Sequence, residues 1–206
     1  MSDLFYNGNF RQNIKKIKGD LIEYARRNNI TIPNDLYVVK CNPLHIHNNI
    51  LIVCPPFNGK DYFKEKEDRY LEKTLDKYGI INRSITYCHL LPLERMNKNA
   101  IKSFRTWIHR ITDLVCPRLI VVLGEDASLS YLNQKALLRD NHGKQIGIYN
   151  DNFGSYTEIY LTYPMEYYLQ KAEFEDDDYK NHLQQHDWTI IRNRYLKLVN
   201  HRTDGE

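Results

Sequence analysis

The stretch Ile50–Phe63, I-L-I-V-C-P-P-F-N-G-K-D-Y-F, decides the fold that the sequence predicts. Its first four residues, Ile50–Val53, are apolar and mostly β-branched, which indicates a buried strand. Two consecutive prolines end this strand because proline donates no backbone hydrogen bond. Asn58 and Gly59 then turn the chain into a helical pattern. In an open α/β sheet, ligands bind at a loop that follows the carboxyl end of a strand, so we expect a functional site here.

Strands and helices alternate along the rest of the chain, which predicts parallel strands joined by right-handed crossovers. The expected central strands are Ile50–Val53, Ile85–Tyr87, Leu119–Leu123 and Ile159–Thr162, with Ile146–Tyr149 as a hairpin partner of the last and a possible short strand at Leu36–Val39. The expected helices include Phe10–Asn28, one capped by Asn97, 126–132, Met165–Lys171 and His182–Val199, and Glu173–Asp178 is expected to be an acidic loop. The predicted fold is a three-layer α/β/α sandwich with a central, mainly parallel four-stranded sheet.

The composition of the chain predicts a globular protein with one domain spanning 1–206. Of its 206 residues, 42% are apolar and 27% are charged, which excludes a disordered chain. No apolar run approaches the roughly 20 residues of a membrane span. The first residues do not resemble a signal peptide. We therefore expect a cytoplasmic protein without a membrane partner.

Neither the cysteines nor the histidines form a recognisable metal motif in the sequence. The four cysteines are far apart and include no C-x-x-C pair, which argues against a zinc or iron–sulfur site. His45 and His47, and likewise His182 and His186, are paired without an evident third ligand, so surface histidines are expected. The net charge of +3 comes from residues 1–30, whose basic helix is either a solvated face or a phosphate contact. No metal and no cofactor are expected.

Three phrases resemble the uracil-DNA glycosylase superfamily, most of all its thermophile-type branch. They are V-C-P-P-F-N-G-K-D at Val53–Asp61, P-R-L-I-V-V-L-G-E-D-A at Pro117–Ala127 and L-T-Y-P-M-E-Y-Y-L at Leu161–Leu169. The resemblance covers roughly residues 48–199. It implies a glycosylase-like core at 48–199, preceded by an N-terminal helix and irregular segment at 1–47.

The departures from the family pattern fall on positions of chemical importance. Cys54 or Pro55 stands where the family carries an acidic or amide residue that activates water. Tyr87 stands near the position of the uracil-reading asparagine, and Tyr163 replaces the histidine of the second motif. The cluster-binding cysteines of the branch are unmatched, so no iron–sulfur cluster is implied.

The resemblance still implies a set of site residues. The catalytic candidates are Asp61 as water activator, Asn58 as its helper, and His89 or Tyr163 as donor to the departing base. The base-pocket candidates are Pro55, Pro56, Phe57, Tyr62, Phe63 and Tyr87. The candidates for DNA contact are Lys60, Lys64, Lys144, Tyr167, Tyr168, Leu169 and Lys171. The alternatives stay open: Asn58 as a turn former, Asp61 as a helix N-cap and the aromatic residues as core.

The expected function is that of a monofunctional DNA glycosylase, which hydrolyses an N-glycosidic bond after the base has been flipped out of the stack. Because the uracil-reading amide is missing, a modified pyrimidine is the expected base. Removal of such bases from phage DNA would serve antiviral defence. The alternative is an inactive glycosylase-fold module that binds DNA or a replication protein. A nucleotide-binding α/β protein ranks last because G-x-G-x-x-G and G-x-x-x-x-G-K-S/T are absent.

Overall fold

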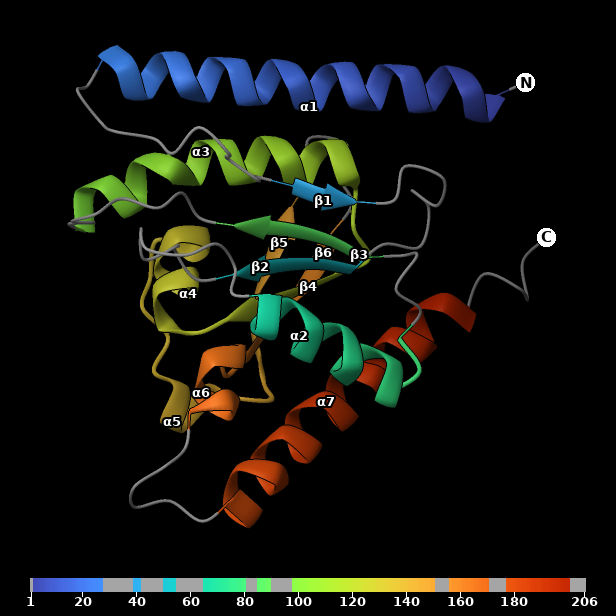
Figure 1. Cartoon of the computed structure of the whole chain (residues 1–206), viewed down its shortest axis with the longest axis vertical. Helices are drawn as coiled ribbons and strands as arrows, with labels where there is room; N and C mark the ends of the chain where they lie inside the picture. The colour runs from blue at the N-terminus through green and yellow to red at the C-terminus, as the bar shows by residue number, and fades with distance from the viewer. Residues whose placement is uncertain are drawn as a thin grey trace.

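Strand β2 (Ile50–Cys54) lies inside a six-stranded sheet, and all five of its residues are buried. Figure 1 shows the computed structural model, with helices on either side of this sheet. The structure describes residues 2–27, 39–41, 50–54, 65–80, 85–89, 98–150, 156–170 and 177–200.

The sheet is mixed, with four parallel strands flanked by two antiparallel edge strands. Its order is β1-β3-β2-β4-β6-β5, and the pairs β1–β3 and β5–β6 are antiparallel. The remaining strands are β1 (Val39–Cys41), β3 (Ile85–His89), β4 (Leu119–Leu123), β5 (Gln145–Asn150) and β6 (Tyr156–Thr162). The predicted parallel strands are confirmed, and so is the hairpin partner of β6. The short first strand begins at the residue where the sequence expected it to end.

Helices cover both faces of the sheet, as Figure 1 shows. Side chains of α1, α3 and α4 join the core on one face, and those of α2, α6 and α7 join it on the other. The helices are α1 (Ser2–Arg27), α2 (Glu65–Lys77), α3 (Lys98–Val115), α4 (Glu125–Leu132), α5 (Leu138–Asn141), α6 (Met165–Leu169) and α7 (Asp177–Asn200). Among the described residues, no helix combines the length and the apolar run that a bilayer span requires.

The alternation of strand side chains divides the core into two layers. Leu51 and Val53 of β2 pack toward α1 and α3, whereas Ile50, Ile52 and Cys54 pack toward α2 and α7. Successive residues of a strand point to opposite faces, so a strand that is covered on both faces must be apolar throughout. This explains why the stretch at Ile50 reads as a continuous apolar run.

Helix α1 lies over α3 at the outside of one layer (Figure 1). The predicted helix at Phe10–Asn28 is confirmed, and its apolar residues Phe10, Ile17, Leu21 and Ala25, which recur at helical spacing, are buried. The helix begins at Ser2, earlier than the sequence predicts. The reason is that residues 7–9 are Asn-Gly-Asn, which are weak helix formers and carry no apolar period.

Helix α7 is attached to the opposite face by an apolar stripe and an ion pair. Trp188, Ile191 and Tyr195 are buried in that layer. Arg194 donates to both carboxylate oxygens of Glu158 in β6, at 2.6 and 2.5 Å. The helix starts at Asp177, inside the predicted acidic loop, since acidic residues are favourable at a helix N-terminus. The rest of that predicted loop lies outside the described residues.

The connections of the parallel strands reverse direction between β2 and β4. After β2 the chain continues to α2 on one face and then to β3, whereas after β4 it continues to α4 on the other face and then to β6. At such a switch point the carboxyl ends of the strands leave a crevice in which α/β proteins bind ligands. The fold therefore places a candidate site at the edge where β2, β4 and β6 end.

The packing of α2 on the sheet is testable with one core truncation. Leu71 is fully buried between α2 and the sheet, so Leu71→Ala should lower the free energy of unfolding by about 2–5 kcal/mol. Urea denaturation measures this change. Leu137→Ala is the matched control, because Leu137 is 50% exposed and its truncation should cost far less. Equal losses for the two variants would contradict the described packing.

Candidate functional site

The carboxyl ends of the four parallel strands meet at one edge of the sheet. Cys54 is paired with His89, and Leu123 is paired with Thr162. The register between β2 and β4 puts Val53 opposite Val122, so the two pairs lie at the same level. The last residues of β2, β3, β4 and β6 thus lie next to one another, although these strands are far apart in the sequence.

Asp187 is a completely buried carboxylate of α7 that faces this edge. Its Oδ2 accepts a hydrogen bond from the hydroxyl of Thr162, the last residue of β6, at 2.8 Å. Its Oδ1 lies 2.7 Å from Nδ1 of His142 and 3.1 Å from Nδ1 of His186. Because an ionised carboxylate only accepts hydrogen bonds, both rings donate from Nδ1 to this oxygen. Three side chains are thus joined to one buried carboxylate.

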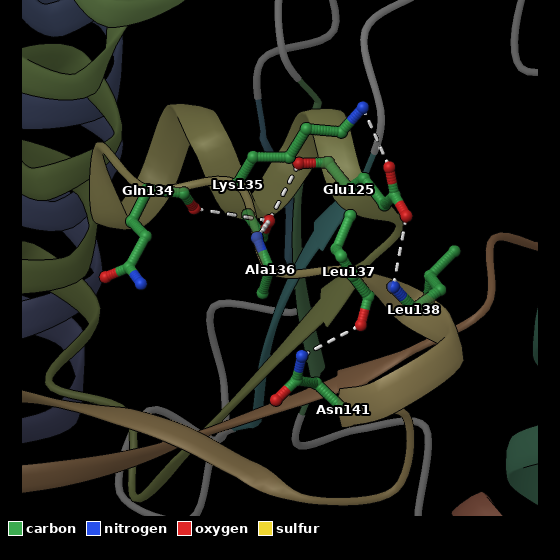
Figure 2. Close-up of polar contacts among 8 residues, drawn as sticks. Glu125, Gln134, Lys135, Ala136, Leu137, Leu138 and Asn141 are labelled. Atoms are coloured by element: carbon green, nitrogen blue, oxygen red, sulfur yellow. Dashed lines mark hydrogen bonds and ion pairs between the residues drawn. The ribbon is translucent and has the colours of Figure 1, made fainter.

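The connection between α4 and α5 determines where His142 lies. Figure 2 shows the polar contacts of this connection. Glu125, at the start of α4, accepts a hydrogen bond from the backbone N–H of Leu138 at 3.1 Å and an ion pair from Lys135 at 2.8 Å. The hydroxyl of Ser128 accepts the backbone N–H of Ala136 at 2.9 Å. These contacts hold the connection against α4 and fix the start of the short helix α5.

The turn after α5 brings His142 onto the buried carboxylate. The backbone N–H of His142 bonds to the carbonyl of Leu138 at 3.0 Å, and that of Gly143 bonds to the carbonyl of Leu161 in β6 at 2.8 Å. Gly143 has a φ of +69°, and a Cβ at this position would lie 2.7 Å from Oδ1 of Asp187. Only glycine satisfies both the backbone conformation and this close approach.

Tyrosine rings form one wall of the same region. Tyr163 follows β6 and lies 5.3 Å from the ring of His142, centroid to centroid, and 4.4 Å from the ring of Tyr167 on which it stacks. Tyr168 points toward the core and stacks on Tyr70 of α2 at 6.4 Å. Such a wall offers flat apolar surface with hydroxyl groups attached.

The buried position of Tyr168 affects its acidity. Burial is the main cause that raises the pKa of the Tyr168 phenol well above its ordinary value, and the charge of Asp187 raises it further, while the side chain of Thr162 opposes the rise. The phenol of Tyr168 therefore stays neutral, which suits a side chain that packs between the tyrosine wall and the core.

An open pocket of about 360 Å³ adjoins the buried carboxylate. Its lining includes Arg139, Asp140, His142, Lys144, His182 and His186. The lining combines two cationic side chains, one carboxylate and three histidines, so it offers charges that attract an anion and imidazole nitrogens that can bind a metal ion.

The structure places the predicted site residues unevenly. Tyr163, Tyr167, Tyr168 and Leu169 follow β6 at the carboxyl edge, and Leu169 is 38% exposed. Tyr87 and His89 belong to β3, with His89 its last residue. Lys144 precedes β5, and its Nζ donates to the carbonyl of Asp140 at 2.8 Å. The following predicted residues lie outside the described part of the chain: Pro55, Pro56, Phe57, Asn58, Lys60, Asp61, Tyr62, Phe63, Lys64 and Lys171.

Sequence reasoning missed His142, Asp187 and the anchoring role of Glu125. The signal that could have led to them was the pair His182 and His186, which the sequence interprets as surface residues without a further ligand. His186 is 57% exposed in its side chain, yet it bonds to the buried acid that follows it. His142, which binds the same acid, lies 45 residues from Asp187 in the sequence.

Comparisons with protein-family models and with curated proteins found no match to this chain. Its function is therefore inferred from the sequence motifs together with the geometry of the described edge.

The anchoring role of Glu125 predicts a pH-dependent loss of stability in Glu125→Gln. The ion-paired hydrogen bond from Lys135 is the largest cause that lowers the pKa of Glu125 below 4.5, followed by the Leu138 N–H. The contribution of the carboxylate is therefore complete above about pH 4.5 and is lost as the pH falls through the lower folded-state pKa. At neutral pH the variant should lose about 0.5–1 kcal/mol of unfolding free energy, allowing for partial solvent screening.

Urea denaturation of both proteins across the acidic range measures this loss. The two stabilities should converge as the carboxylate of the wild type becomes protonated. A difference that is the same at pH 7 and at pH 3 would contradict the charge-based role of Glu125. Lys135→Gln, which keeps the Leu138 contact, should be milder than Glu125→Gln.

Proposed function

We propose that this chain is a DNA glycosylase of the uracil-DNA glycosylase type, with a three-layer α/β/α fold. It would hydrolyse the N-glycosidic bond of a flipped, modified pyrimidine other than uracil. The observation that carries the proposal is the alignment of the parallel strands, which brings the end of β2, the end of β3 and the segment after β6 to one edge. These are the segments to which the resemblance assigns catalysis and base recognition.

The chemistry of the proposed reaction assigns roles at this edge. Cleavage of the bond between base and sugar passes through an oxocarbenium-like sugar, which a nearby carboxylate stabilises while it positions water. Asp61, with Asn58 beside it, would fill that role in the loop after β2. His89 or Tyr163 would donate a proton or hydrogen bond to the departing base.

The described part of this site suits a planar ligand. Tyr163 and Tyr167 stack at the end of β6, and bases stack on such rings with an energy of about 1–3 kcal/mol each. Lys144 and Arg139 border the adjacent pocket, where they could hold phosphates. Leu169 is exposed at the end of α6, in the position that suits a wedge entering the vacated stack.

The proposed base is a modified pyrimidine because the uracil-reading amide has no counterpart near Tyr87. A pocket without this amide loses the hydrogen bonds that select the uracil edge, and it could admit a larger base such as a hydroxymethylated or glycosylated pyrimidine. Enzymes that remove such bases from phage DNA would protect a host cell.

One observation favours the alternative of an inactive module that binds DNA or a replication protein. Cys54 or Pro55 stands where the family carries a residue that activates water, and the side chain of Cys54, the last residue of β2, is completely buried. A buried thiol in an apolar core cannot position water for the reaction. The enzyme proposal therefore depends on Asp61, and the decisive experiment is directed at that residue.

Asp61→Asn should abolish base release while it leaves DNA binding nearly unchanged. The substitution keeps the volume of the side chain but removes the charge that would orient water, and loss of such a group commonly costs about 10²–10⁴ in rate. Assays of abasic sites and released bases on DNAs with and without modified pyrimidines measure the reaction, and fluorescence anisotropy measures binding.

Asp76→Asn is the matched control, because Asp76 is an exposed acid on α2. It should retain full activity. Base release by Asp61→Asn at the wild-type rate would remove Asp61 from the mechanism. Absence of release from every modified DNA by the wild type would favour the inactive-module alternative.

Tyr163→Phe tests the group that would contact the leaving base. The variant keeps the ring that stacks on Tyr167 and removes the hydroxyl. If this hydroxyl donates to the departing base, the single-turnover rate should fall by about 10²–10³ while DNA affinity stays the same. Tyr179→Phe, at a side chain that is 54% exposed on α7, should leave the rate unchanged. An unchanged rate in Tyr163→Phe would assign the donor role to His89.

A further inference from the structure

His142, His186 and Asp187 form a compact group of metal-ligating side chains beside the tyrosine wall. One ligand atom from each residue lies within 4.8 Å of the other two. His142 comes from the turn after α5, whereas His186 and Asp187 are neighbours on α7. The tertiary fold, not the local sequence, brings His142 close to His186 and Asp187.

We propose that these three residues bind a first-row divalent metal ion, with zinc as the preferred one. Two imidazole nitrogens and one carboxylate oxygen are ligands that zinc accepts, and sites with three protein ligands keep a further position open for water or substrate. The ion would lie between Oδ1 of Asp187 and the two Nδ1 atoms, in place of the two hydrogen-bond protons, and each neutral ring would then carry its proton on Nε2. The sequence alone predicts no metal, so this proposed site comes from the structure.

The observed distances are slightly shorter than those between ligand atoms of one zinc ion, so the replacement needs a small rearrangement. Oδ1 lies 2.7 Å from Nδ1 of His142 and 3.1 Å from Nδ1 of His186. Tetrahedral zinc ligands sit about 2.0–2.2 Å from the ion and therefore roughly 3.4 Å from one another, so Nδ1 of His142 needs to move away from the oxygen by about 0.7 Å and Nδ1 of His186 by about 0.3 Å. The larger movement falls to His142, whose side chain is 20% exposed, and the smaller one to His186, whose side chain is 57% exposed.

The carboxylate is held in position by atoms outside the proposed ligand set. The Thr162 hydroxyl donates to Oδ2 at 2.8 Å, which leaves Oδ1 directed at the two histidines. Gly143 brings the backbone against the same oxygen, since a Cβ there would lie 2.7 Å from Oδ1 and 3.0 Å from Nδ1 of His186. Such surrounding contacts orient metal ligands and are typical of metal sites. Thr162 is therefore a positioning residue for the site.

The open side of the proposed site faces the pocket of about 360 Å³. His142 and His186 both line this pocket, together with His182 one helical turn before His186. An ion at Asp187 would thus remain accessible to water and to an anionic ligand that enters past Arg139 and Lys144. The site does not depend on the glycosylase proposal, because it uses none of the residues to which that proposal assigns the hydrolysis of the bond.

Metal titration of the full chain, first treated with a chelator, tests the proposal. Isothermal titration calorimetry with zinc chloride should show saturable binding of one ion per chain. Cobalt chloride should produce visible absorption bands typical of Co²⁺ held by nitrogen and oxygen ligands. Bound zinc should also raise the melting temperature, since a ligand that binds only the folded state stabilises it.

His142→Ala and His186→Ala should each raise the dissociation constant at least about tenfold. Gly143→Ala should also weaken binding, because its Cβ would press on the carboxylate. His186→Ala is the safest variant for folding because its ring is largely exposed, and circular dichroism would verify its structure. His182→Ala is the matched control on the same helix and should change the dissociation constant by less than about threefold.

The proposal fails if the wild type binds none of zinc, cobalt, nickel or manganese ions in a saturable way. It also fails if His186→Ala binds zinc as tightly as the wild type. A loss of affinity in His182→Ala as large as in His186→Ala would overturn the assigned set of ligands. None of these readouts depends on base release, so the outcome is separate from that of the glycosylase experiment.

Discussion

Strand β2 has parallel neighbours on both sides and helices over both faces, and this constraint organises the rest of the structure. Parallel neighbours cannot be joined by a tight turn, so the chain must cross over through helices between consecutive strands. The crossovers after β2 and β4 lie on opposite faces of the sheet. The chain therefore leaves these two strands toward helices on opposite faces, and the site region lies at the edge between the two strand ends.

The second organising contact is the buried carboxylate of Asp187. A buried carboxylate is tolerated only when its oxygens accept hydrogen bonds from donors nearby. Here the donors come from the end of β6, the turn after α5 and α7 itself. This carboxylate therefore ties together three elements at the edge where the parallel strands end, and it makes the position of α7 specific as well as stable.

Much of the fold could be predicted from the sequence because apolar runs and helical stripes carry a strong local signal. The strands at Ile50 and Leu119 and the stripe of α1 are of this kind. Helix α5 could not be predicted, since four residues are too few to show a period. The edge strand β1 is defined by pairing with β3, and a short run such as Val39–Cys41 has little signal of its own.

The candidate site was less accessible to sequence reasoning than the fold. The tyrosines after β6 could be placed at the edge because they follow a strand directly. His142 and Asp187 could not be associated, because their contact depends on how the α4–α5 connection and α7 pack. In the sequence Asp187 looks like an ordinary acid of a solvated helix, and only the packing shows that it is buried.

The close approach at Gly143 has a consequence for how this protein can change over evolutionary time. Any side chain at that position would displace the carboxylate of Asp187 or the ring of His186. Substitutions at His142, Gly143, Thr162, His186 and Asp187 are therefore not independent, and drift at one of them requires compensation at another. Homologues should keep these positions as a block or lose them as a block, and a His-Gly pair before an edge strand with His-Asp on the last helix would identify those that keep it.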